Sequence, residues 1–283
     1  MSPITTSVAT VTDSTCDIPH NTADLLRIRV VPTLLTLEGK TYEDGHRFSR
    51  SVFSHRMPCL TRPAMTAAVS SKAFESAYES ALASGVHNAV SIHVSSRLSG
   101  IFDAATQAAE SSGERVKPLD GGHIFMALGF QAILAAEAAL EGAALDTMIR
   151  ILDQARQRVR RIALIDTLEY LKRSGRVTWL RASIGDLLRV RLLVSIIDGL
   201  GRRIDKIRTK CRGLERLMTL ARSWGRLERL AVLHSGVPDD ARAFAEQLGN
   251  FTSHPLIVIE VTPVIGARVG PARLGLAARL GQV

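Results

Sequence analysis

The stretch "NAVSIHVSSRLSGIFDAATQAAE" covers residues 88–110 and holds an apolar run, a serine-rich loop and a helix-forming segment in succession. Residues 88–94 are rich in Val and Ile and predict a strand. The segment 99–113 predicts a helix, and Ser95 and Ser96 lie in the loop between strand and helix. A strand followed by a helix of this length is the repeating unit of a mainly parallel sheet, so the stretch favours an α/β fold.

The same alternation continues on both sides of this stretch. Further strands are predicted at 7–12, 27–37 and 115–120, and helices at 71–83 and 123–140. Pro32 indicates an edge or a bulge within 27–37.

Beyond residue 160 the pattern changes. Residues 192–209 predict two strands joined by a turn that contains Asp198 and Gly199, which breaks the strand–helix alternation. We therefore expect two α/β domains, 1–160 with a mostly parallel sheet and flanking helices, and 161–283 with a mixed sheet, with a ligand between them. The length of 283 residues also favours two domains.

Composition limits the location and the partners. No segment offers the roughly 20 uninterrupted apolar residues that a transmembrane helix needs, since Gln131 and Glu137 interrupt the richest one, 123–142. No signal peptide is apparent, and three cysteines without CxxC spacing predict reduced thiols in a cytoplasmic protein. The net charge of +9 favours an acidic partner, which could be nucleic acid, an anionic membrane surface or an acidic protein. Aromatic residues, at 5%, offer little stacking surface for bases.

A second notable stretch is "IGARVGPARLGL" at 265–276. Its pattern predicts a helix over 272–280 with Pro271 in the first turn, because proline suits that position. Gly270 would let backbone approach an anion at the helix N-terminus, and Arg268 carries a guanidinium suited to a carboxylate or phosphate. The alternative is a glycine turn with a surface arginine.

Polar residues follow two predicted strands. Ser95, Ser96 and Ser99 follow 88–94, where ligands bind at the carboxyl ends of strands, although Ser99 is better explained as a helix cap. Asp13 and Ser14 follow 7–12 and could form a polar cleft, but structural turn roles are favoured there.

Several classes of site are not indicated. The histidines form no pair at the spacing of a zinc-binding helix, and no Walker loop, dinucleotide fingerprint or nucleophile elbow is present. We therefore predict no metal, no cofactor and no catalytic residue. The stretch 165–178 predicts a short helix that ends at Gly175 and is followed by Arg176, and 177–188 predicts a further helix.

Taken in order, five stretches resemble the motifs of the DegV family. They are "VTDSTCDIP" (11–19), "RVVPTLLTLEGKTYEDG" (29–45), "HVSSRLSGIFDAA" (93–105), "DTLEYLKRSGRV" (166–177) and "IGARVGPARLGL" (265–276). The resemblance runs over nearly the whole chain. It implies a fatty-acid-binding protein rather than an enzyme, holding one fatty acid between two α/β domains. Some members of the family are the carrier subunit of a bacterial fatty acid kinase.

The resemblance also implies site residues. Positions that bind the carboxylate in the family fall on Thr66, Ser96, Arg176 and Arg268 here. From the residues themselves, Ser95, Gly266 and Gly270 are predicted to support these positions, and Asp13 and Ser14 are candidates for a polar cleft.

The chain departs from the family at several of these motifs. Ala67-Ala68-Val69 replaces Ser-Gln-Pro after Thr66, Ile101-Phe102 replaces Thr-Tyr, Gly121 replaces a serine after Asp120, and Arg191-Leu192 replaces Lys-Pro. Arg268 stands where the family has histidine. Arginine does not accept a proton near neutral pH, but it binds a carboxylate firmly.

The main hypothesis is therefore a carrier that binds a long-chain fatty acid in a tunnel, lined in part by the helix 123–140, with Ser/Thr hydroxyls and arginine on the carboxylate. A separate kinase subunit and transient contact with anionic membranes are the expected partners. One alternative is an enzyme that uses the same cleft for an anionic small molecule. The other is a nucleic-acid-binding regulator that uses the basic stretch 201–212.

Overall fold

The computed structural model describes residues 7–45, 48–67, 69–83, 85–176, 191–197, 199–249 and 252–281. Its internal contacts divide the chain into two compact units, each made of two segments. Unit 1 comprises Met1–Thr33 and Ala68–Arg158, and unit 2 comprises Leu34–Ala67 and Val159–Val283. The segment 34–67 therefore packs with the C-terminal half of the chain. The predicted helix 177–188 lies outside the described residues.

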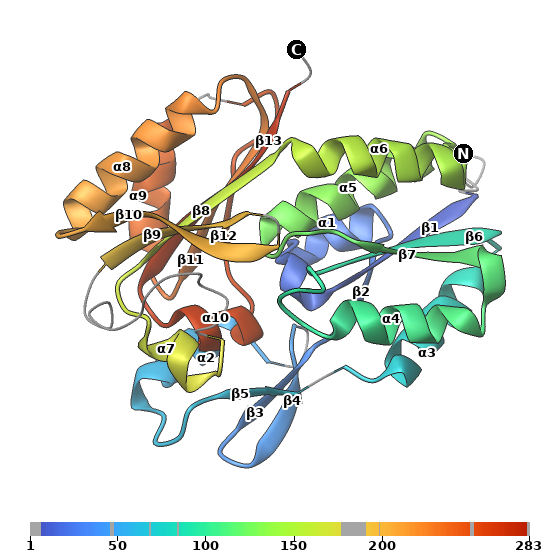
Figure 1. Ribbon diagram of the computed structural model, residues 1–283, viewed down its shortest axis with the longest axis horizontal. Helices are drawn as coiled ribbons and strands as arrows, with labels where there is room; N and C mark the ends of the chain where they lie inside the picture. The colour runs from blue at the N-terminus through green and yellow to red at the C-terminus, as the bar shows by residue number, and fades with distance from the viewer. Residues whose placement is uncertain are drawn as a thin grey trace. The chain divides into compact units, whose positions relative to one another are not determined.

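Unit 1 is built on a four-stranded parallel sheet with helices on both faces (Figure 1). The strand order is β2 (Arg29–Val31), β1 (Val8–Asp13), β6 (Asn88–His93) and β7 (Val116–Asp120). The helices α3 (Ser71–Ala83) and α4 (Ile101–Glu110) pack together on one face, and α5 (Met126–Leu140) and α6 (Leu145–Gln157) on the other. Shorter elements are η1 (Ser14–Cys16), α1 (His20–Leu25) and η3 (Gly113–Arg115).

The helix α5 is the centre of the unit 1 core. Twelve of its fifteen residues are buried, so it presents apolar surface in every direction, as expected for a helix enclosed by protein. Gly129 lets α5 approach η1 closely, because a Cβ atom there would lie 2.5 Å from the carbonyl oxygen of Cys16.

Unit 2 contains a six-stranded mixed sheet in the order β10-β9-β8-β13-β11-β12. Its strands are β8 (Val159–Ile165), β9 (Arg191–Ile197), β10 (Leu200–Ile207), β11 (Leu227–Ser235), β12 (Ile257–Glu260) and β13 (Arg273–Leu280). Only β11 and β12 pair in parallel; the other neighbours are antiparallel. The helices α8 (Lys210–Ser223) and α9 (Pro238–Leu248) pack on this sheet through a shared apolar core. The predicted fold class, with a mostly parallel N-terminal sheet and a mixed C-terminal sheet, is confirmed.

The predicted helix over 272–280 is wrong. Residues Arg273–Leu280 form β13, which lies between β8 and β11. Seven of its eight residues are buried, so the strand is covered on both faces and lacks the simple alternation of a half-exposed strand. The helix lies earlier, as α10 (Pro263–Val269), with Pro263 in its first turn.

A three-stranded antiparallel sheet completes unit 2, in the order β4 (Lys40–Glu43), β3 (Leu34–Leu37) and β5 (Met65–Ala67). It shares an apolar core with α2 (Arg50–Arg56), η2 (Met57–Cys59) and α10, and α7 (Glu169–Arg173) packs on α10. The predicted extended stretch 27–37 divides at Pro32 into β2 of unit 1 and β3 of unit 2. Within the described part of the chain, no helix is both long and apolar enough to cross a membrane.

Candidate functional site

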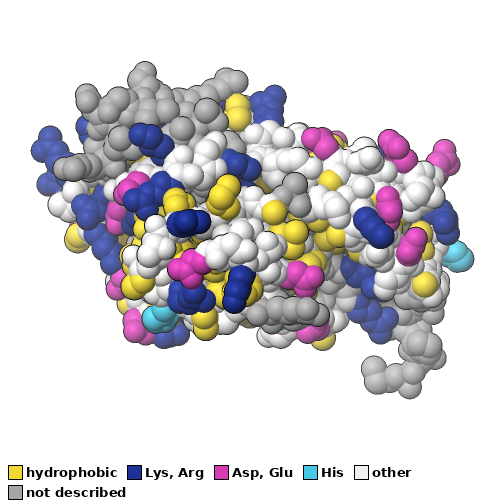
Figure 2. All heavy atoms as spheres, turned by 90° about the horizontal axis from the view of Figure 1, so that it is seen from below, with side chains coloured by type: hydrophobic (Ala, Val, Ile, Leu, Met, Phe, Trp, Pro, Cys, Tyr) yellow, Lys and Arg dark blue, Asp and Glu magenta, His cyan; other side chains and the backbone are white. Residues whose placement is uncertain are grey.

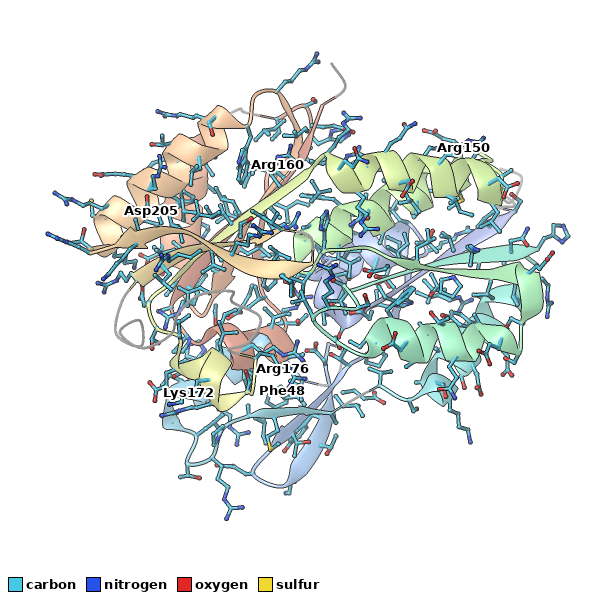
Figure 3. The ribbon with its side chains drawn as sticks, in the orientation of Figure 1. Phe48, Arg150, Arg160, Lys172, Arg176 and Asp205 are labelled. Carbon is cyan, nitrogen blue, oxygen red and sulfur yellow. The ribbon has the colours of Figure 1, made fainter. Side chains whose placement is uncertain are left out.

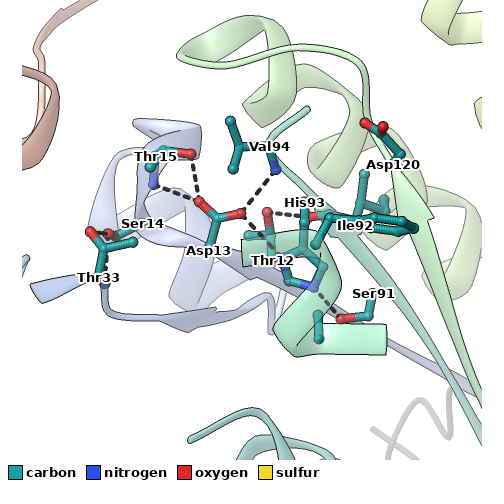
Figure 4. A network of polar contacts seen from close by, with 12 residues as sticks. Thr12, Asp13, Ser14, Thr15, Thr33, Ser91, Ile92, His93, Val94 and Asp120 are labelled. Atoms are coloured by element: carbon teal, nitrogen blue, oxygen red, sulfur yellow. Dashed lines mark hydrogen bonds and ion pairs between the residues drawn. The ribbon is translucent and has the colours of Figure 1, made fainter. Parts of the chain in front are cut away.

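Three neighbouring parallel strands of unit 1 each end on a titratable residue. Asp13 ends β1, His93 ends β6 and Asp120 ends β7. The register pairs His93 with Asp120, and β1 lies on the other side of β6. The three side chains and the loops that follow them therefore share one edge of the sheet (Figure 4), which we call the polar edge. In parallel α/β sheets this edge is where ligands bind.

Asp13 is fully buried and accepts four hydrogen bonds. Thr15 donates to Oδ1 through its backbone N–H (3.0 Å) and its hydroxyl, while Val94 N–H and His93 Nδ1 donate to Oδ2, each at 3.1 Å. Burial would raise the pKa of Asp13, but these donors, with His93 foremost, hold that pKa below its ordinary value. The carboxylate thus ties η1 to the loop after β6 (Figure 4).

His93 continues this network into the core. Its Nε2 lies 2.6 Å from Ser91 Oγ, and the Tyr78 hydroxyl lies 3.0 Å from the same oxygen. Since an ionised Asp13 can only accept, Nδ1 of His93 carries a proton and donates it to Asp13. Burial raises the pKa of Tyr78 to about 12. The order Asp13–His93–Ser91 is that of a nucleophilic triad, but all three side chains are fully buried, so no substrate reaches Ser91.

Ser14 is also engaged within unit 1. Its Oγ lies 2.7 Å from Thr33 Oγ1 and accepts the Thr33 backbone N–H at 3.1 Å. In this structure Asp13 and Ser14 hold backbone and side chains of their own unit in place.

Ser96, which is exposed, and Asp120, which is half-buried, form the outer part of the polar edge. The Ser96 hydroxyl donates to Asp120 Oδ2 at 2.7 Å, and its backbone N–H donates to the same oxygen at 3.3 Å. The Gly122 N–H donates to Asp120 Oδ1 at 2.7 Å, so the carboxylate joins the loops after β6 and β7.

Ser95 and Ser99 have structural contacts in the same loop. Ser95 is buried, and its N–H donates to the carbonyl of His123 at 3.0 Å. The predicted capping of a helix by Ser99 is wrong, because the N-cap of α4 is Gly100 and no side chain caps that helix.

In unit 2 the structure brings together two predicted residues that lie far apart in sequence. Arg268 lies in the last turn of α10 and is 5% exposed. Its Nη2 donates to the hydroxyl of Thr66, in β5, at 3.1 Å. A buried guanidinium beside a half-buried hydroxyl is a donor set suited to a carboxylate or phosphate.

Arg176 follows α7 in the same unit and is half-buried (Figure 3). Its Nη1 donates to the carbonyl of Ser174 at 3.0 Å.

The glycines of the last motif serve helix packing. A Cβ atom at Gly266 would lie 2.9 Å from the Phe53 ring, so this glycine lets α10 pack on α2. Gly270 ends α10 with a φ of +85°, and a Cβ atom there would lie 2.5 Å from the Tyr170 ring. The predicted helix N-terminus after Gly270 is therefore absent, because Gly270 follows a helix and precedes a strand.

Arg273, the second arginine of that motif, takes part in an internal ion pair. Its Nη1 lies 2.8 Å from Asp166 Oδ2, and Arg191 Nε lies 3.1 Å from the other oxygen of Asp166. Burial lowers the pKa of Arg273, and Asp166 opposes that shift. Arg273 is thus committed to Asp166 rather than to a ligand.

A small hollow in unit 2 lies between η2, the segment that follows it, α7 and α10. Its apolar wall includes Met57, Ala64 and Ala267, and its polar wall includes Tyr170 and Arg173. Neither Thr66 nor Arg268 is among the residues that line this hollow. Among the residues with described positions, no group of three His, Cys, Asp or Glu side chains could hold a metal ion.

Sequence reasoning missed two residues of the polar edge, His93 and Asp120. Both are titratable residues in the last position of a strand, like Asp13. A search for polar residues in that last position would have found them.

The comparisons with known proteins agree with the fold. The family model described as "Uncharacterised protein, DegV family" matches residues 7–280. A DegV domain-containing protein of Streptomyces coelicolor is 34% identical over 95% of this chain and 97% of its own length. A DegV domain-containing protein of Mycobacterium tuberculosis is 32% identical over 97% of this chain and 98% of its own length.

Solved structures give the same result. A DegV family protein of Thermus thermophilus, described as fatty-acid binding, is 27% identical and superposes with a TM-score of 0.88 over 97% of this chain and 100% of its own. DegV of Bacillus subtilis, described as a fatty acid binding protein, is 27% identical with a TM-score of 0.89 over 98% of this chain and 100% of its own. By its match to the family model and its identity with these relatives, the chain belongs to the DegV family.

Proposed function

We propose that this protein binds a long-chain fatty acid and that Thr66, Ser96, Arg176 and Arg268 hold the carboxylate. The observation that carries the proposal is the buried Arg268 guanidinium donating to Thr66. A guanidinium presents several N–H donors in a planar fork, which suits the two oxygens of a carboxylate, and the Thr66 hydroxyl lies within reach of the same group. The fatty-acid binding described for the relatives from Thermus thermophilus and Bacillus subtilis supports the choice of ligand.

An acyl chain would supply most of the affinity. Each methylene removed from water contributes about 0.8 kcal/mol, so a long chain outweighs the cost of ordering the head group. We include in the proposal that the acyl chain occupies a tunnel between the two domains, lined in part by α5.

We also propose that the bound carboxyl group is presented to a separate fatty acid kinase subunit, and that basic surface assists transient contact with anionic membranes. The positive net charge supports an acidic partner. On the face shown in Figure 2, Lys and Arg side chains lie among hydrophobic and acidic ones rather than in one continuous stripe. The low aromatic content of 5% gives little support to the nucleic-acid alternative, because few side chains can stack on bases.

The test is mass spectrometry of the purified protein, first native and then after solvent extraction. We expect a stoichiometric fatty acid in the wild type and its loss in the Arg176→Ala, Arg268→Ala variant. Thr66→Val, which keeps the side-chain shape, is expected to weaken binding about tenfold through loss of one hydrogen bond to a charged group. Arg202→Ala, Arg203→Ala is the matched control, because it removes two exposed cations from β10 of the same unit.

An apo mass that stays unchanged after incubation with a fatty-acid mixture would contradict the proposal. An anionic small molecule in its place would favour the enzyme alternative.

A further inference from the structure

The Ser96 hydroxyl is the starting point, because it has one proton and that proton is already engaged. Ser96 Oγ lies 2.7 Å from Asp120 Oδ2, and an ionised carboxylate can only accept hydrogen bonds. Ser96 must therefore donate its proton to Asp120. A hydroxyl oxygen that donates its proton keeps two lone pairs, which can accept from another group.

Asp120 is held in this position by further contacts. The Gly122 N–H donates to Oδ1 at 2.7 Å and the Ser96 N–H donates to Oδ2 at 3.3 Å. The Asp120 carboxylate is therefore fixed at the polar edge, and a ligand that binds at Ser96 lies beside this carboxylate.

An ionised fatty-acid head group is also only an acceptor. At Ser96 it must compete with Asp120 for one proton, and the two carboxylates would repel across a single hydroxyl. A head group that carries its own donor, such as an alcohol, can donate to Ser96 Oγ without displacing Asp120.

We propose that Asp120 is a specificity-determining residue that weakens binding of ionised carboxylates at Ser96 and favours head groups able to donate a hydrogen bond. The inference rests on the proposed function, because it assumes an acyl ligand with its head group at Ser96. It assigns to Asp120 a role opposed to that of Arg268: the arginine attracts the carboxylate, and the aspartate limits its affinity.

The experiment compares the dissociation constants of palmitic acid and cetyl alcohol for delipidated wild type and Asp120→Asn. In the variant, Oδ1 can still accept from Gly122, and Nδ2 can donate to Ser96 Oγ, which frees the serine proton for the ligand. The long 3.3 Å contact from the Ser96 N–H is lost, because an amide nitrogen cannot accept it. We expect Asp120→Asn to bind palmitic acid about tenfold more tightly than the wild type does, because one hydrogen bond to a charged group is gained. The affinity for cetyl alcohol is expected not to increase. Asp103→Asn is the matched control, since it removes one exposed negative charge from α4 of the same unit.

The double variant Ser96→Ala, Asp120→Asn isolates the mechanism. If Asp120 acts through the Ser96 proton, Asp120→Asn increases the affinity for palmitic acid less in the Ser96→Ala background than in the wild type. The remaining increase is then due to the removed charge alone. Unchanged or weaker binding of palmitic acid by folded Asp120→Asn, or an equal gain for the alcohol, would overturn the inference. Failure of the wild type and every variant to bind either lipid would instead refute the proposed function. Circular dichroism and thermal unfolding confirm that each variant is folded.

Discussion

Two buried titratable residues, Asp13 and His234, have opposite surroundings. Four donors surround Asp13 and favour its charged form. His234, the last residue but one of β11, is 6% exposed. Burial holds the pKa of His234 below its ordinary value of 6.5; Glu260 opposes this shift and Arg242 adds to it. The fold therefore stabilises a charged Asp13 and a neutral His234.

His234 makes stability depend on pH below 6.5. Above that value the ring is neutral in both folded and unfolded chains. As the pH falls below 6.5, the unfolded chain takes up a proton before the folded one does, so the free energy of unfolding decreases. We expect His234→Gln to remove this part of the pH dependence, measured by urea unfolding at several pH values on both sides of 6.5.

The exposed His55 on α2 of the same unit provides the control, as His55→Gln. If His234→Gln and wild type lose stability in parallel as the pH falls, His234 does not contribute to the dependence.

Among the elements, the junction of α10 with β13 determines where Arg268 lies. The helix ends at Gly270, whose hydrogen atom faces the Tyr170 ring of the α7 helix, and the chain then turns into a central strand. Arg268 is held two residues before this turn. The closeness of the ring and the positive φ both require glycine at this position.

We expect Gly270→Ala to destabilise the protein by about 3 kcal/mol, since it combines an unfavourable φ with a steric clash. Gly142→Ala is the matched control, because Gly142 has a φ of +84° and nothing within 4 Å of its added Cβ atom. That variant is expected to cost about 1 kcal/mol. If denaturant unfolding shows equal decreases in the free energy of unfolding for the two variants, the clash with Tyr170 contributes nothing to the cost of Gly270→Ala.

The same elements show what sequence patterns can predict. The strand–helix alternation of 88–110 was predictable because each element has a clear apolar period and a polar boundary. The pattern of 272–280 did not identify the strand, because "ARLGLAARL" lacks a two-residue alternation and its Ala, Leu and Arg suit a helix as well as a buried strand. The contact of Asp13 with His93, across 80 residues, depends on strand order, which a single sequence does not contain.

At the scale of the whole molecule, the chain builds two units from four segments. Unit 2 takes residues 34–67 from the first half of the sequence, and with them Thr66, which Arg268 contacts. The candidate anion-binding pair of unit 2 is thus complete only when two distant segments have folded together.

We expect the two units to differ in their response to a core substitution. Leu276 is fully buried in β13, and Leu276→Ala is expected to cost about 3 kcal/mol through loss of packing. In hydrogen exchange, protection is expected to fall in β8, β11 and β13 and to persist in α5 of unit 1. Uniform loss of protection in both units would show that they unfold as one cooperative body.

The central place of β13 has a consequence for biosynthesis. This strand pairs with β8 on one side and β11 on the other, yet it is the last of the strands to be translated. All segments of unit 1 precede residue 159, so that unit can fold while translation continues. The six-stranded sheet of unit 2 cannot be completed until residues 273–280 have left the ribosome, so one edge of β8 and one edge of β11 stay unpaired until then. A premature stop in this region would leave those edges unpaired and open to aggregation.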